Sequence, residues 1–138
     1  MESVNRLSAV VAALAIAGCA SGGSYRLSNG PQTPAAEGVV KTSYGGNGNT
    51  RLKITVDHLA LPDKVQAGAS VYVVWAMPDG KGGHPQSLGA LKVGDKLQGT
   101  LETLTPLQDF HLTITPEPAA SVSAPSGPPV LTAEIVRR

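Results

Sequence analysis

The chain has 138 residues, and its 11 Lys and Arg against 10 Asp and Glu give a formal net charge of +1 at pH 7. This length suits a single domain, and the near-neutral charge without a basic stripe argues against a nucleic-acid partner. The single cysteine excludes an intramolecular disulfide and a zinc or iron–sulfur site built from several cysteines.

Residues 1–18 have the features of a helical signal peptide. A polar start with Arg6 is followed by the apolar run Leu7 to Ala17, which is shorter than the ~20 residues that a membrane-spanning helix needs. Ile16-Ala17-Gly18, directly before Cys19, resembles the lipobox of bacterial lipoprotein signal peptides. That resemblance implies cleavage before Cys19 and diacylglycerol on its sulfur. A lone cysteine is more often a small buried hydrophobe, but Cys19 does not lie in a patterned strand.

The lipobox resemblance also predicts a location. Two or more acyl chains anchor a protein stably to a membrane, so the mature protein is expected in the cell envelope, lipid-anchored and extracytoplasmic. Ala20 rather than Asp follows Cys19, which by the sorting rule of lipoproteins favours the outer membrane if the source has two membranes.

A segment rich in Gly and Pro comes next. Residues 22–36 contain few large apolar side chains and include the turn signals Asn29-Gly30-Pro31 and Thr33-Pro34. This composition is typical of a linker. We therefore predict a flexible stalk over residues 19–36, which would lift a folded domain of residues 37–138 off the membrane.

Seven short strands are predicted in that domain. Thr50 to Asp57 alternates strictly between apolar and polar residues, and Ser70 to Met77 is a continuous apolar run stopped by Pro78-Asp79-Gly80. A buried helix is the alternative for the second run, but its length and its Pro/Gly stop favour the most buried strand. The other predicted strands are Val39–Tyr44, Ser87–Val93, Leu97–Thr103, Phe110–Thr115 and Val130–Val136.

These strands and the turns between them predict an all-β fold, an immunoglobulin-like antiparallel β-sandwich of about seven strands. Trp75 in the most buried strand is the expected anchor between the two sheets. Tyr72 and Phe110 are the other aromatic residues expected in the core.

Four motifs in this region resemble the extracytoplasmic C-terminal domain of anti-sigma-K factors: Tyr72-Val73-Val74-Trp75, Leu88-Gly89, the segment Phe110 to Pro118, and the segment Ala124 to Leu131. The resemblance covers roughly residues 50–135 and implies a β-sandwich outside the cytoplasm. Pro116 is a departure, because the family more often runs straight into Glu-Pro. The chain shows neither the cytoplasmic helical domain nor the transmembrane helix of those factors, so no direct sigma-factor binding is expected.

Candidate catalytic and metal-binding residues do not form a recognised motif. His58, His84 and His111 lack the spacing of metal ligands, and Asp57-His58 lacks a Ser nucleophile in a G-x-S-x-G turn. The segment Gly80 to His84 lacks the Ser or Thr and the helix of a phosphate loop and is expected to be a hairpin turn. We therefore predict no enzymatic activity, no metal and no cofactor.

The proline-rich segment Pro116 to Pro129 fits either a polyproline ligand or, preferably, a crossing between the two sheets.

The sequence thus favours a non-catalytic interaction or sensing module with a protein partner in the envelope. The expected contact points are Arg51, Lys53 and Thr55 on one sheet and the loop Pro78 to Pro85. The alternative is a small ligand-carrying or hydrolytic lipoprotein, which would need a pocket with convergent polar groups.

Overall fold

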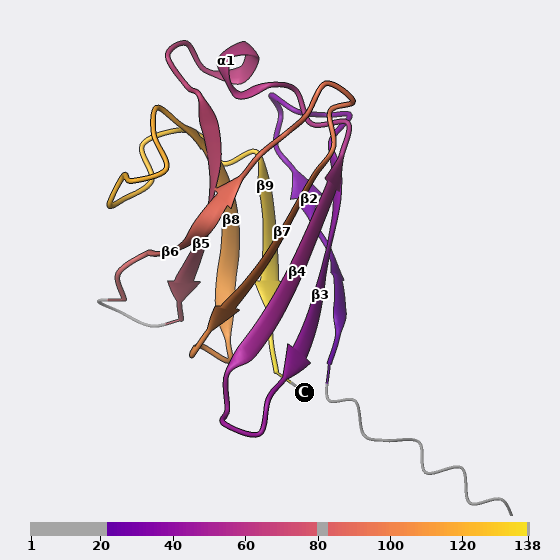
Figure 1. Cartoon of the computed structure of the whole chain (residues 1–138), viewed down its shortest axis with the longest axis vertical. Helices are drawn as coiled ribbons and strands as arrows, with labels where there is room; N and C mark the ends of the chain where they lie inside the picture. Colours follow the sequence, from indigo (N-terminus) through magenta and orange to yellow (C-terminus); the bar gives the residue numbers. More distant parts are fainter. Residues whose placement is uncertain (1–21, 80–82, 138) are drawn as a thin grey trace, which may run out of the picture.

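The computed structural model describes residues 22–79 and 83–137, which form two antiparallel sheets packed face to face (Figure 1). The signal peptide and Cys19 lie outside the described residues. The four-stranded sheet has the order β1-β3-β4-β7, and the five-stranded sheet has the order β2-β9-β8-β5-β6. The elements are β1 (Ser24–Arg26), β2 (Ser28–Asn29), β3 (Glu37–Tyr44), β4 (Thr50–Asp57), α1 (Pro62–Val65), β5 (Val71–Pro78), β6 (Gln86–Leu91), β7 (Gly99–Thr105), β8 (Phe110–Glu117) and β9 (Leu131–Ile135).

The predicted all-β sandwich is confirmed, and a strand is found at each of the seven predicted places. In β3 and β4 exposed and buried residues alternate without interruption. Each of these strands therefore turns one face to water and the other to the core. Leu52, Ile54 and Val56 of β4 are fully buried in the core cluster that also holds Tyr72 and Phe110.

The expectation of a flexible stalk is wrong for residues 22–36. Ser24–Arg26 pairs with β3, and Ser28–Asn29 pairs with β9 of the opposite sheet. Between them Leu27 is only 5% exposed, and its N–H donates to the Gly38 carbonyl at 2.8 Å. This segment needs few apolar residues because it completes two existing sheets through backbone hydrogen bonds.

The later part of the expected stalk is also held in place. Thr33 and Ala36 are buried, and the Thr33 hydroxyl donates to the Val130 carbonyl at 3.0 Å. The sandwich therefore includes residues before 37, contrary to the expected domain boundary.

Trp75 is fully buried, as predicted, but it does not lie between the sheets. Tyr72, Val74 and Ala76 belong to the core cluster, whereas the intervening Val73 and Trp75 do not. Successive strand residues point to opposite faces, so Trp75 lies on the outer face of the five-stranded sheet. The expectation of an inter-sheet anchor failed because β5 is buried on both faces, and a continuous apolar run does not show which face meets the other sheet.

The connection between β8 and β9 closes over this outer face (Figure 1). The Trp75 indole N–H donates to the Thr115 hydroxyl oxygen at 2.9 Å, and that hydroxyl donates to Glu117 Oε1 at 2.7 Å. Glu117 in turn accepts hydrogen bonds from the backbone N–H and hydroxyl of Ser126 and from the N–H of Gly127. The prediction that Pro116 to Pro129 crosses between the two sheets is wrong, because β8 and β9 are neighbours in one sheet. The connection instead covers Trp75.

We expect Trp75→Ala to lower the free energy of unfolding by about 3–5 kcal/mol, the cost typical of truncating a buried large aromatic residue. Trp75→Phe, which keeps a ring but loses the indole N–H, should cost less. Urea denaturation followed by circular dichroism measures both values. Because Trp75 is the only tryptophan, native fluorescence gives an independent check, and a red-shifted emission that iodide quenches freely would contradict its burial.

Candidate functional site

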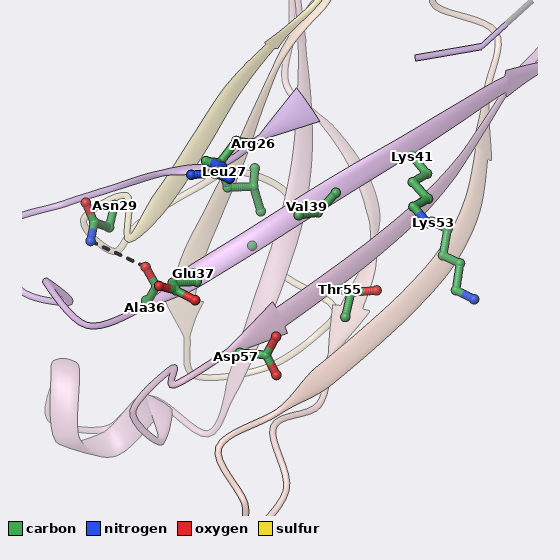
Figure 2. Close-up of a pocket in the computed structure, with 11 residues that line it drawn as sticks. Arg26, Leu27, Asn29, Ala36, Glu37, Val39, Lys41, Lys53, Thr55 and Asp57 are labelled. Atoms are coloured by element: carbon green, nitrogen blue, oxygen red, sulfur yellow. Dashed lines mark hydrogen bonds between the residues drawn. The ribbon is translucent and has the colours of Figure 1, made fainter. Parts of the chain in front are cut away.

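A groove runs over the outer face of the four-stranded sheet (Figure 2). It encloses about 660 Å³, a volume in the range of ligand-binding clefts. Its lining comes from β1, β3, β4 and the segment between β1 and β3: Arg26, Leu27, Asn29, Ala36, Glu37, Gly38, Val39, Lys41, Lys53, Thr55 and Asp57.

The antiparallel register of β3 and β4 arranges the floor of the groove in rows. Glu37 lies opposite Asp57, and Lys41 lies opposite Lys53. In the row between these pairs Val39 is flanked by Thr55 on β4 and by Arg26 on β1. Figure 2 shows the two lysines near each other and the two carboxylates toward the opposite end.

One wall of the groove exists because the first strand changes sheets. Past Arg26 the chain leaves β3, and Leu27 packs into the interior beside Gly38, where a Cβ would collide with the Leu27 side chain. The Asn29 amide then donates to the carbonyl oxygens of Pro34 at 2.6 Å and Ala36 at 3.3 Å. These bonds tie the departing segment to the residues that lead back into β3.

The charges that β3 and β4 bring to the groove are segregated, and Arg26 of β1 lies in the row between them. Like charges directly opposite each other on neighbouring strands repel and destabilise the sheet, and the groove holds two such pairs. The carboxylate row and the lysine row are four residues apart along β3, which corresponds to about 13 Å. Among the described residues the only ion pair that involves these side chains joins Lys53 to Glu102 at 3.9 Å, and it is well exposed and therefore weak.

An apolar residue lies between the charged rows. Val39 is 37% exposed and is one of three large hydrophobic residues exposed in the described part of the chain. An extended molecule with a basic group, an apolar centre and an acidic group would complement the two carboxylates, Val39 and the two lysines of this groove.

Three residues singled out by the sequence lie in the groove: Lys53, Thr55 and Asp57. Arg51 lies outside the groove, opposite Leu104 and next to the β3–β4 turn. The loop Pro78 to Pro85 joins β5 and β6 of the other sheet, and its residues 80–82 lie outside the described residues. The predicted contact points therefore do not form one surface.

The three histidines are not brought together in a metal site, and the described residues contain no group of three or more His, Cys, Asp and Glu side chains that could hold a metal ion. His58 is exposed and has a left-handed φ of 55°, a conformation in which histidine is enriched. His111 Nε2 lies 3.0 Å from Asp79 Oδ1, and His84 is exposed.

Sequence reasoning missed Arg26, Glu37, Val39 and Lys41 as site residues. The alternation in β3 already placed Val39 and Lys41 on one face. Their relation to Asp57 and Lys53 depends on the register between strands, which no single-strand pattern contains.

Among the described residues, Glu117 is the one acidic residue that is buried. Its environment favours the charged form. Burial raises the pKa of Glu117, but the hydrogen bonds from Ser126, Thr115 and Gly127 outweigh this effect and bring its pKa below the ordinary value. The Gly127 backbone can come this close to Glu117 because glycine lacks a Cβ. A Cβ at this position would collide with the Pro116 carbonyl. Thr115, Glu117, Ser126 and Gly127, all from the motifs described above, thus have a structural role.

The chain matches no protein-family model and no curated protein sequence. Within residues 22–79 and 83–137 there is no helix with the length and hydropathy required to span a membrane.

We expect Glu117→Gln to lower the free energy of unfolding at pH 7 by about 1.5–3 kcal/mol, the size of hydrogen bonds to a charged group. Because the folded-state pKa is lowered, the carboxylate stabilises the protein above its unfolded pKa of about 4.3, and this contribution is lost as the pH falls through the folded value. The difference between wild type and variant should therefore shrink in acid. Urea denaturation from neutral to acidic pH measures it.

Glu134→Gln is the matched control, because Glu134 is exposed on the same face of the same sheet. This variant should lose little stability. A Glu117→Gln effect that is independent of pH would show that the charge of Glu117 does not stabilise the fold.

Proposed function

We propose that this chain is a membrane-anchored lipoprotein of the bacterial cell envelope whose β-sandwich is a non-catalytic interaction or sensing module. The observation that carries the interaction role is the groove with two like-charged rows and Val39 between them. A partner that brings opposite charges to both rows would relieve both repulsions.

The anchor is proposed from the sequence. The run Leu7 to Ala17 followed by Ile16-Ala17-Gly18-Cys19 supports lipidation of Cys19. Outer-membrane sorting in an organism with two membranes follows from Ala20. The similarity of the later motifs to the extracytoplasmic domain of anti-sigma-K factors supports the same compartment, without direct contact with a sigma factor.

The partner that fits the groove best is an extended protein segment. Its basic side chain would meet Glu37 and Asp57, its acidic side chain would meet Lys41 and Lys53, and an apolar side chain would cover Val39. The separation of about 13 Å equals four residues of extended chain. Complementary charges of this kind chiefly give specificity and faster association.

A ligand-carrying role is the second candidate, because the volume of the groove also suits a small molecule with opposite charges at its two ends. A hydrolytic role would instead depend on Asp57, His58 and His84. Cross-linking at position 55 and substitution of Asp57, His58 and His84 separate the role of a protein partner from the hydrolytic role.

For the anchor, we expect Cys19→Ser to abolish lipid labelling and to leave an uncleaved or mislocalised precursor, because serine has no thiol to accept diacylglycerol. Metabolic labelling of cells with an alkyne fatty acid measures this directly. Undiminished labelling of the variant would rule out Cys19 as the lipid attachment site.

For the partner, a photo-cross-linking amino acid at position 55 should capture a discrete protein in intact cells, because Thr55 lies on the floor of the groove. The same group at position 134, exposed on the opposite sheet, is the control. We expect Lys41→Gln combined with Lys53→Gln to reduce capture at position 55 at least tenfold without a loss of stability, because the neutral pair removes a like-charge contact and loses only the exposed ion pair with Glu102.

Equal capture at positions 55 and 134 would contradict a partner in the groove. A triple variant that combines Asp57→Ala, His58→Ala and His84→Ala provides the other test. If it loses cellular function and the lysine substitutions have no effect, the hydrolytic alternative is favoured.

A further inference from the structure

The position of β1 limits the distance between the sandwich and a lipid on Cys19. Cys19 precedes Gly22 by three residues, and an extended chain spans at most about 3.6 Å per residue, or about 11 Å in total. Gly22 is fixed beside β3, because the N–H of its neighbour Gly23 donates to the Thr42 hydroxyl at 2.8 Å and the Thr42 N–H donates to the Gly23 carbonyl at 2.8 Å.

Gly22 therefore lies near the end of β3, at the lower end of the sandwich in Figure 1, where the C-terminal residues also lie. The Tyr25 hydroxyl donates to the Val136 carbonyl, which ties the first strand to the last residues of the domain. The order of the elements thus determines which end of the sandwich faces the anchor.

The side chains at this end suit a lipid surface. We call the group Tyr44, Arg51, Leu104, Val136 and Arg137 the anchor-side surface. Leu104 is 55% exposed and Val136 is 36% exposed, and they are two of the three exposed large hydrophobic residues in the described ranges. Arg51 lies opposite Leu104, and the Arg137 guanidinium stacks on the Tyr44 ring at 4.4 Å.

This combination of residue types has a known physical preference. Tyrosine rings and the apolar stems of arginine favour the boundary between headgroups and acyl chains. Each Lys or Arg near an anionic membrane contributes about 1 kcal/mol of attraction.

Two acidic groups of the groove are placed away from this end. Glu37 and Asp57 lie at the other end of their strands, and Asp57 is six residues from Arg51, or about 20 Å. Asp109 lies near the anchor-side surface, where its carboxylate accepts the Arg137 N–H at 2.8 Å. Glu102 pairs with Lys53 one row above Arg51.

We infer that the anchor-side surface rests on the headgroups of an anionic phospholipid bilayer, so that the sandwich stands on the membrane instead of being held above it by a linker. This inference rests on the proposed lipidation of Cys19. It adds a second membrane contact, made by the folded domain itself.

Two glycines allow a matched test on the full-length lipidated protein. Gly46 lies in the β3–β4 turn next to the anchor-side surface, and Gly94 lies between β6 and β7 at the opposite end. A Cβ at either position would meet no atom within 4 Å. Gly46→Cys and Gly94→Cys proteins, labelled with a fluorophore, are reconstituted into phosphatidylcholine vesicles with or without phosphatidylglycerol. The vesicles also carry a lipid with a quencher on its headgroup.

We expect quenching at position 46 to exceed quenching at position 94 several-fold in the anionic vesicles and to decrease in the neutral ones. Arg51→Glu should reduce quenching at position 46, whereas Lys92→Glu, an exposed lysine near the opposite end, should leave it unchanged.

Flotation of the vesicles separates the two hypotheses. Protein that does not float with the vesicles and carries no lipid contradicts the proposed anchor. Protein that floats but shows equal quenching at both positions, or quenching insensitive to vesicle charge and to Arg51→Glu, overturns the membrane-contact inference alone.

Discussion

The change of sheet at Leu27 is the constraint on which the other features of this structure depend. A single buried leucine separates a strand of the four-stranded sheet from a strand of the five-stranded sheet. Because the chain leaves the edge of β3 at this point and passes to the other sheet, its residues Leu27 and Asn29 contribute to the lining of the groove. The same change of sheet places the first described residues in the fold, where the sequence predicted a linker.

Most of the fold could be predicted because period-two alternation identifies strands with one wet face, as in β4. The two first strands could not be found in this way. They have three and two residues, too few to show a period, and their Gly- and Pro-rich surroundings resemble a linker. Their order comes from backbone pairing with β3 and β9, and a sequence pattern does not identify such partners.

The candidate site was predictable only in part, for a related reason. Lys53, Thr55 and Asp57 share a face by alternation, so the sequence placed them together on an exposed surface. Glu37, Val39 and Lys41 join them only through the register of two strands. Trp75 shows the same limit, since its burial could be read from the apolar run but its face could not. The network that ends at Ser126 depends on a connection that doubles back over the sheet.

The pairing of β1 with β3 also has a mechanical consequence. Gly22 enters the fold at the lower end of the sandwich, so a force that draws it away from that end acts along the axis of β1 (Figure 1). The pairs Ser24 with Lys41, Tyr25 with Val40 and Arg26 with Val39 are then loaded together in shear, and they do not open one after another. The β1–β3 pairing therefore resists a pulling force applied to the N-terminal side of the domain. The buried Leu27 holds the next part of the chain in the interior.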